Sequence, residues 1–255
     1  MNVRHRVALS AMLFPALLTF HSAHAEGTSG WEGTAGLGAL VVPRYTGGQS
    51  QRLVAAPIVD ASYKDVVRIE LFRATAYLGS SQDRKMGWGL AVEPRFGFHA
   101  SDGPRLSGLA KRGDSLEGGP SFDWDLGVAD LNVSWFRDFT GRSGGTSFNA
   151  TIQKDLVETP RWELSINGGF DRLSARTANY YFGVAPGEAV AGRPSYRPGT
   201  GVNLVAGAKG LFRLDARHSI EFGTYATRLN AAAAASPIVE TRVAKIFWLG
   251  FGWTL

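Results

Sequence analysis

The chain has 255 residues and a formal net charge of +5, and it contains no cysteine. Without cysteine it has no disulfides, no thiol nucleophile, no cysteine metal site and no lipidated cysteine. The basic excess is small and scattered, which excludes the dense positive patch expected of a nucleic-acid-binding protein.

The first 25 residues predict a secretory signal peptide. A positive segment over residues 4–6 precedes an apolar run over residues 7–20, and Ala23 and Ala25 supply the small-x-small pattern before a cleavage site. An N-terminal membrane anchor is the alternative, but this apolar run of about 14 residues is shorter than the roughly 20 needed to span a bilayer. We therefore expect export, cleavage after Ala25 and a mature domain over residues 26–255.

The mature sequence alternates apolar and polar residues almost throughout, and it has no apolar run long enough for a transmembrane helix. Within residues 161–173 the apolar face consists of Trp162, Leu164, Ile166 and Phe170, and the polar face includes Glu163, Ser165 and Asn167. Residues 147–156 repeat the pattern. Alternation of this kind predicts strands. Two all-β architectures fit: a soluble sandwich, or a transmembrane antiparallel up-and-down β-barrel whose apolar face contacts lipid.

Eleven strand-like segments are centred near residues 36, 56, 72, 93, 124, 134, 151, 166, 206, 222 and 248. A single-chain bacterial barrel needs an even number. We place the missing strand at residues 104–112, entered by a tight turn at residues 101–103. Short turns near residues 63, 102, 129, 158 and 214 then share one side, and the mostly longer loops near 46, 82, 115, 142, 186 and 235 share the other. The prediction is twelve strands, with ten as the alternative.

The last residues favour the barrel over the sandwich. One face of the final segment carries an apolar row, Phe247, Leu249, Phe251, Trp253 and Leu255. A strand that closes a barrel in lipid needs such a row. The row also resembles the C-terminal signal recognised by the outer-membrane assembly machinery, although the usual last residue is Phe or Trp and here it is Leu255.

Four segments, in order along the chain, resemble the MipA/OmpV family of MltA-interacting proteins. They are "GLGALVVPRYTGG" (36–48), "RLSGLAKRGDSLEGGPSFDW" (105–124), "YYFGV" with "YRPGTG" (180–184 and 196–201), and "YATRLNAAAAASPIVE" (225–240). Together they cover most of the mature chain. The family often has acidic residues before the position of Ser236, where this chain has alanines.

The resemblance implies an outer-membrane barrel of a Gram-negative cell that acts as a non-catalytic scaffold in cell-wall growth. The family's namesake bridges a lytic transglycosylase and a penicillin-binding murein synthase, so these enzymes and outer-membrane lipid are the implied partners. A small diffusion channel or surface adhesin is the alternative within the family, and a soluble periplasmic binding protein is a third reading. The signature loop comprises Tyr180, Tyr181, Phe182, Gly183, Val184, Tyr196, Arg197, Pro198 and Gly199.

The three aromatics of this loop allow two interpretations. They form an aromatic girdle where a strand leaves the membrane, or the loop folds back into the barrel mouth and Arg193 or Arg197 pairs with a lumen acid such as Glu93 or Asp171. In the second case residues 183–199 limit access to the lumen, and deleting residues 186–196 should raise conductance.

No catalytic, metal or cofactor motif is present in the sequence. The two mature histidines, His99 and His218, lie far apart and outside any nucleophile motif. Asp123 and Asp125 share a face and could do acid–base work or bind calcium. We favour a lumen salt-bridge network for them, with Arg95, Arg137 and Lys154 as the cations. The sequence therefore predicts a protein that is not an enzyme and has no cofactor.

Overall fold

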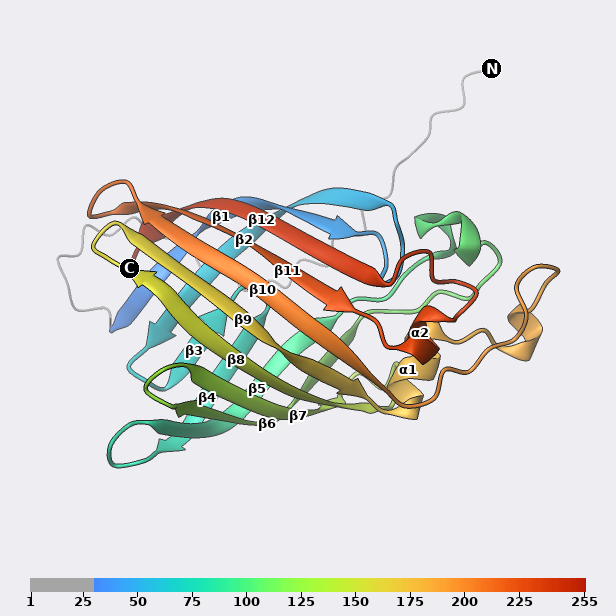
Figure 1. Ribbon diagram of the computed structural model, residues 1–255, viewed down its shortest axis with the longest axis horizontal. Coiled ribbons are helices and arrows are strands. Elements are labelled where there is room, and N and C mark those ends of the chain that lie inside the picture. The colour runs from blue at the N-terminus through green and yellow to red at the C-terminus, as the bar shows by residue number, and fades with distance from the viewer. Residues whose placement is uncertain (1–29) are drawn as a thin grey trace, which may run out of the picture.

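A closed antiparallel barrel is formed by residues 30–255, the part of the chain that this computed structural model describes (Figure 1). Successive strands pair with each other, and the first pairs with the last from Thr34↔Thr254 to Val41↔Phe247. No helix among these residues is long and apolar enough to cross a membrane. The predicted cleavage site at Ala23 and Ala25 lies outside the described residues, so the signal peptide stays a prediction.

Twelve strands are described, which confirms the predicted number over the alternative of ten. They are β1 (Trp31–Pro43), β2 (Gln51–Tyr63), β3 (Val67–Glu70), β4 (Arg73–Ser80), β5 (Met86–Arg95), β6 (Ser115–Asp125), β7 (Asp130–Asp138), β8 (Thr146–Glu158), β9 (Trp162–Leu173), β10 (Gly201–Arg213), β11 (His218–Arg228) and β12 (Val243–Thr254). The helices are α1 (Ala175–Phe182), α2 (Ala231–Ala234) and three short 3₁₀ turns, η1 (Ala100–Asp102), η2 (Pro104–Leu106) and η3 (Pro186–Glu188).

The position predicted for the missing strand was wrong. Residues 104–112 form η2 and an irregular segment within one long connection between β5 and β6. The twelfth strand comes instead from the segment near residue 72, which is a hairpin of β3 and β4. Its turn at Leu71 and Phe72 has no glycine, proline, asparagine or aspartate, and Leu71 adopts a positive φ of 44°. The residue types at these positions therefore did not predict a turn.

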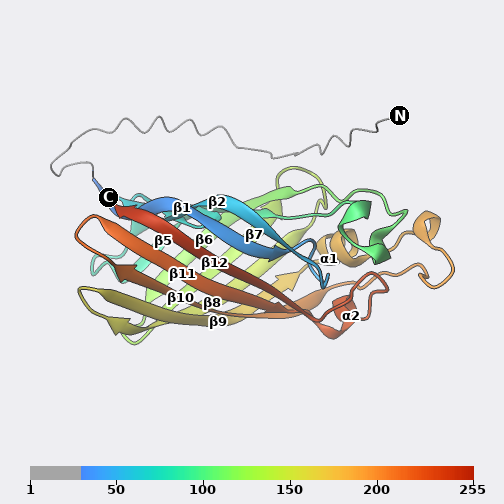
Figure 2. The same cartoon turned by 90° about the horizontal axis from the view of Figure 1, so that it is seen from above.

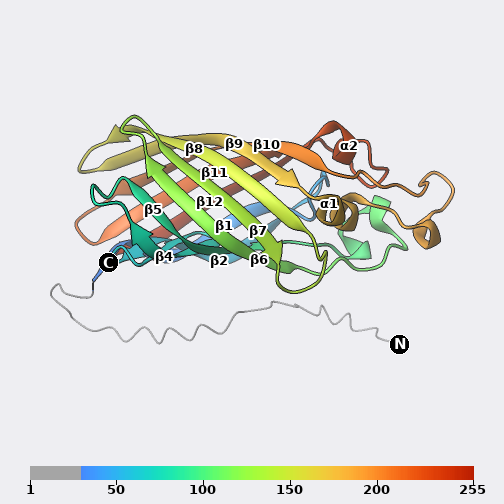
Figure 3. The same ribbon diagram turned by 90° about the horizontal axis from the view of Figure 1, so that it is seen from below.

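The connections differ in length between the two ends of the barrel. Short turns over residues 64–66, 81–85, 126–129, 159–161 and 214–217 share the end where β1 begins and β12 ends, here called the turn end. The long connections, with α1 and α2, gather at the opposite loop end (Figures 2 and 3). The turn near residue 82 was predicted on the loop side but lies at the turn end. The predicted turns near 102 and 115 belong to one loop-end connection, because the extra strand between them does not exist.

The predicted alternation sorts side chains between the lumen and the outer surface. On β9, Ser165 is 6% exposed inside the barrel, and Ile166, the next residue, is 45% exposed outside. The C-terminal row behaves likewise, with Phe247, Leu249 and Phe251 between 42% and 59% exposed. This row lies on the outer face as predicted, whereas its role as an assembly signal stays a prediction.

Outward-facing aromatics form two belts that flank an aliphatic band. At the turn end Trp31 packs against Tyr63 with ring centroids 5.2 Å apart, and Trp162 packs against Phe212 at 4.4 Å. At the loop end Phe148 faces Phe170 at 6.0 Å. Exposed aliphatic residues lie between the belts: Leu37, Leu90, Ile152, Ile166 and Leu249. Paired aromatic belts around an apolar band are the surface expected of a membrane barrel.

Losses of stability of very different size are expected from arginine at two adjacent positions of β8. Ile152→Arg puts a charge on the aliphatic band and should cost about 2–4 kcal/mol if the band lies near the bilayer midplane. Gln153→Arg places the same side chain in the lumen, beside the carboxylates described below, and should cost far less. Urea unfolding in lipid vesicles measures both. Equal losses of stability would show that the outer band does not contact hydrocarbon.

Candidate functional site

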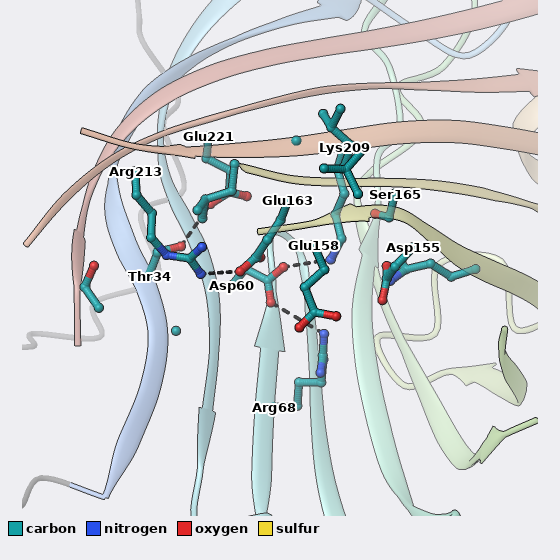
Figure 4. Close-up of a pocket in the computed structure, with 17 residues that line it drawn as sticks. Thr34, Asp60, Arg68, Asp155, Glu158, Glu163, Ser165, Lys209, Arg213 and Glu221 are labelled. Carbon is teal, nitrogen blue, oxygen red and sulfur yellow. Dashed lines mark hydrogen bonds and ion pairs between the residues drawn. The ribbon is translucent and has the colours of Figure 1, made fainter. Parts of the chain in front are cut away.

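A charged chamber of about 340 Å³ occupies the lumen near the turn end (Figure 4). Alternation brings its polar side chains together from strands on several sides of the barrel. Its lining carries five carboxylates and three cations: Asp60, Asp155, Glu158, Glu163 and Glu221, with Arg68, Lys209 and Arg213. The lining therefore has an excess of two negative charges.

Ion pairs cross this chamber. The Lys209 Nζ atom on β10 lies 2.8 Å from Asp60 Oδ2 on β2 and 3.6 Å from Glu70 Oε1 on β3. Arg68 contacts the same two carboxylates, at 3.6 Å and 2.9 Å. Because β10 and β2 are four strands apart around the barrel, the Lys209–Asp60 pair spans the lumen. Charges removed from water need such partners, and here Lys209 and Arg68 have two each.

The remaining carboxylates differ in their partners. Glu163 pairs with Arg213, and Glu221 accepts a 3.2 Å hydrogen bond from the Thr34 hydroxyl. Asp155 and Glu158 have no cation partner among the described residues. The chamber thus favours cations. In the described part of the chain, however, no group of three or more histidines and carboxylates is placed to hold a metal ion.

A second layer of charge crosses the lumen nearer the loop end. Arg95 on β5 contacts Glu117 on β6 at 2.9 Å and Asp171 on β9 at 3.3 Å. Glu117 is 1% exposed and also accepts a 3.0 Å hydrogen bond from the Ser147 hydroxyl. Since β5 and β9 are also four strands apart, Arg95 links two walls. Arg95 thus joins a lumen network as predicted, but its partners are Glu117 and Asp171 and not the predicted Asp123 and Asp125.

The other predicted members of that network lie elsewhere. Asp123 accepts hydrogen bonds from the Tyr77 hydroxyl at 2.9 Å and from Asn132 at 2.6 Å, and Asp125 binds the Gly127 N–H in a turn. Arg137 and Lys154 are exposed and form no ion pair with the described residues. Alternation along β7 and β8 turns both side chains to the outside of the barrel, so the prediction of these two residues as lumen cations was wrong.

The two histidines serve local structure. The His218 ring lies 2.9 Å from Asp215 in an exposed turn, and the backbone N–H of His99 donates to Asp102 Oδ2 at 2.7 Å. They lie at opposite ends of the barrel, one after β5 and one at the start of β11. The described residues therefore bring no histidine pair together for acid–base catalysis.

The signature aromatics lie on a helix that crosses the loop-end mouth. Ser174 caps α1 by accepting a hydrogen bond from the Thr177 N–H, and the helix packs on β8 and β9. From there the Tyr181 hydroxyl reaches Ser115 at the start of β6, 2.8 Å away, and Phe182 is 3% exposed. The girdle interpretation was wrong, and the folded-back alternative describes the loop. The capping serine was the local signal for a helix that sequence reasoning missed.

The rest of the signature loop is held by backbone contacts. Val184 and Tyr196 exchange two 2.9 Å backbone hydrogen bonds, and the Gly199 N–H donates to the Asn179 side chain. Arg193 donates to the carbonyls of Arg105, Ser107 and Glu188. It does not pair with Glu93 or Asp171 as predicted, because those acids lie on the barrel wall. Arg197 is exposed, and Gly183 and Pro198 lie at least partly covered beside these contacts.

The four segments that carry the family resemblance meet at this mouth. The Tyr45 hydroxyl donates to the Ile238 carbonyl at 2.9 Å, and the Tyr196 hydroxyl donates to the Ala232 carbonyl at 2.7 Å. One buried cluster draws from all four: Tyr45, Phe98, Leu106, Leu109, Val184 and Ile238. A second cluster joins Tyr181 and Phe182 to the region of α2. We call this assembly the loop plug.

Residues 186–196 form the outer part of the plug and not its base. In Figure 1 this excursion extends away from the barrel beyond α2, whereas α1 lies at the mouth. Its inward contacts are made by Glu188, Arg193 and Tyr196. Because α1 and the buried residues of both clusters lie outside residues 186–196, we do not expect deletion of the excursion alone to open the lumen.

A buried ion pair fastens the excursion to the plug. Arg112 and Glu188 meet through two hydrogen bonds of 2.7 Å and 2.9 Å, and the Ala110 and Ala185 N–H groups also donate to Glu188 at 3.0 Å. Hydrogen bonding from Arg112 is the main cause that lowers the pKa of Glu188 to about 2. Both side chains are less than 15% exposed.

Comparison with known proteins gives one family match. The family described as MltA-interacting protein MipA matches residues 35–255. No curated protein matches the chain. Among solved structures, Ail, the attachment invasion locus protein of Yersinia pestis in complex with the heparin analogue sucrose octasulfate, is 8% identical, with 88% of this chain and 97% of that chain covered and a TM-score of 0.21. A Pseudomonas aeruginosa FadL homologue is 9% identical, with 88% and 89% covered and a TM-score of 0.27. Scores this low support no argument.

The clamp between Arg112 and Glu188 should weaken in acid. A carboxylate whose pKa is depressed in the folded protein stabilises it above the ordinary pKa of 4.5, and that contribution is lost as the pH falls toward about 2. Amide hydrogen exchange at Ala110, corrected for intrinsic rates, should therefore show constant protection from neutral pH to about pH 5 and a decline below it. The Glu188→Gln variant should show lower protection without that decline. An identical acid response in both proteins would exclude Glu188 as the cause.

Proposed function

The chain belongs to the MltA-interacting protein MipA family, and we propose that it is a non-catalytic outer-membrane scaffold for cell-wall enzymes. The observation that carries this proposal is the occupied lumen. Two layers of ion pairs span the barrel, around Lys209–Asp60 and around Arg95–Asp171, and the loop plug covers one mouth. A barrel filled by its own side chains and plugged is suited to anchoring partners more than to passing solutes.

The outer surface supports the membrane location. The two aromatic belts and the aliphatic band between them match the interfaces and the hydrocarbon core of a bilayer. Short turns on the periplasmic side and longer loops outside are the usual asymmetry of such barrels. We therefore place the turn end in the periplasm, where murein and its enzymes are found, and we expect a cleaved signal peptide to direct export.

The proposed partners would dock at the turn end. Two of its turns expose valines: Val66 is 50% exposed and Val128 is 75% exposed. Leu214, in a third turn, is 45% exposed. Exposed apolar turn residues are suited to contact a protein. The family description names MltA, so a lytic transglycosylase is the first partner we propose, and a penicillin-binding murein synthase is the second.

A small diffusion channel is the second candidate. The excess of negative charge and the unpaired carboxylates Asp155 and Glu158 are features that a cation channel would need. The Arg95 layer lies between that chamber and the loop plug, and its ion pairs cross the lumen there, which favours the scaffold over the channel. A surface adhesin would use the loop end instead, and the docking experiment below separates it from the scaffold.

Site-specific cross-linking in cells tests the scaffold. Because the chain has no cysteine, a single Val128→Cys substitution gives a unique attachment point for a photoactivatable cross-linker at the turn end. We expect it to capture a lytic transglycosylase, identified by mass spectrometry. Gly187→Cys, on the exposed loop-end excursion, is the matched control and should not capture it. If a protein is captured only from the Gly187→Cys variant, the adhesin is favoured. If neither variant captures a murein enzyme, the scaffold is contradicted.

A further inference from the structure

The barrel wall is incomplete on one side near the loop end. β2 has thirteen residues and pairs with β1 along its whole length, from Gln51↔Pro43 to Tyr63↔Trp31. Its other edge pairs with β3 only from Asp60 to Tyr63, because β3 has four residues. One further hydrogen bond, from the Leu71 N–H to the Val59 carbonyl, ends the contact. Residues 51–58 thus have no strand on that edge within the described chain.

The facing edge across this gap belongs to β5. Its ladder to β4 ends at Val92↔Ala74, while its ladder to β6 continues to Arg95↔Ser115. The last residues of β5 are therefore paired on one side only. Figure 1 shows the short β3 and β4 in the half of the barrel that holds the turn end, while β2 runs on toward the loops. We call the gap bounded by residues 51–58, the Leu71–Phe72 turn and residues 93–96 the β2–β5 window.

Proline stands on both edges of the window. Backbone groups two residues apart on a strand point the same way. The Val59 carbonyl faces β3, so the nitrogen of Pro57 faces the open edge. The Met86 carbonyl faces β4, where it accepts from Ser81, so by the same parity Pro94 faces the window. Proline has no N–H to leave unpaired, and it is confined to strand edges. One proline on each edge thus reduces the number of backbone donors that the gap leaves unpaired.

Side-chain exposure confirms that the wall is open. Five consecutive residues of β2, from Gln51 to Ala55, are exposed, so both faces of the strand are accessible. The loop end of β10 lies in a fully paired wall and shows the contrast. There Val202 and Leu204 are 45% and 54% exposed, while Asn203, between them, is 2% exposed.

The window is lateral and separate from the mouth. Above it Tyr45 packs against Phe98 with ring centroids 5.9 Å apart, which joins the β1–β2 loop to the β5–β6 loop within the plug. Below it Phe72 packs edge-on against Phe96 at 5.5 Å. Phe96 is 47% exposed and belongs with the loop-end aromatics, so the window opens at the level of that belt.

The β2 side of the window is apolar, whereas Glu93 and Arg95 on the β5 side face the lumen and are charged. On the lumen side β2 presents Val54, Ala56 and Ile58, and Ile58 packs over the glycines of neighbouring strands at Gly38 and Gly250. On the outer side the rim includes the exposed Leu53. At the depth of the aromatic belt, the surrounding medium is the acyl-chain boundary of the outer leaflet. The chemistry of the β2 side of the opening therefore matches a hydrocarbon chain.

We propose that the β2–β5 window admits an acyl chain of an outer-leaflet lipid into the part of the lumen beneath the loop plug. This rests on the membrane location proposed above. An extra β-strand from another chain is the competing occupant, since open edges recruit strands. Pro57 and Pro94 remove a backbone donor from each edge and disfavour such pairing. The Arg95 ion pairs cross the lumen between this region and the chamber, so we place the chain on the loop-end side of them.

Quenching by lipid tests the proposal. Single cysteines are introduced into the cysteine-free chain at Ala56, on the lumen face beside the window, at Thr151, on the lumen face of the complete wall, and at Leu164, on the outer face. Each is labelled with a small thiol-reactive fluorophore and reconstituted into phosphatidylcholine vesicles with or without brominated acyl chains. Heat-modifiable gel migration confirms that each variant has folded.

We expect brominated chains to quench the labels at Ala56 and Leu164 comparably and to leave the label at Thr151 nearly unquenched. If the label at Leu164 is quenched but the label at Ala56 is quenched no more than the label at Thr151, the window proposal is wrong and the membrane location still holds. Failure to quench at Leu164 would overturn the membrane location itself. Loss of quenching at Ala56 on raising the protein-to-lipid ratio, with a dimer detected by cross-linking, would assign the edge to a second copy and not to lipid.

Discussion

The constraint on which the structure depends is that a strand in hydrocarbon must pair its backbone on both edges. Closing the sheet of β1 to β12 meets that requirement almost everywhere. Closure also forces the period-two alternation to divide the side chains into an apolar outer surface and a polar interior. Where the wall is not closed, between β2 and β5, Pro57 and Pro94 each remove one backbone donor from an open edge, which lowers the cost of the exception.

Closure has a second consequence, because it concentrates charge inside the barrel. A charge withdrawn from water is costly unless it is paired, and pairing within a lumen requires partners on other walls. Lys209 and Arg95 find theirs four strands away, at 2.8 Å and 3.3 Å, and so they link walls that the sheet alone does not connect. The lumen is thereby occupied, and what remains available to partners is the exterior: the turn end, the loop end and the window.

Much of the fold could be predicted from the sequence, because alternation is local information. Alternation alone predicted which residues of β8, β9 and β12 face the lumen and which face outward. The β3–β4 hairpin did not, since a leucine occupies the positive-φ position of its turn. The plug was missed for another reason: its contacts, such as the Tyr45 hydroxyl to the Ile238 carbonyl, join residues 193 positions apart. The resemblance marked the four segments concerned, although the residue types alone could not show that they meet.

Conductance in planar bilayers tests the central claim most directly, which is that side chains of the barrel itself close the lumen. The account predicts no stable channels from the parent protein, and open channels from an Arg95→Ala/Lys209→Ala double variant that still shows heat-modifiable migration, because both charge layers then lose the cations that link their walls. Sustained channels from the parent protein, unchanged by the double substitution, would contradict it.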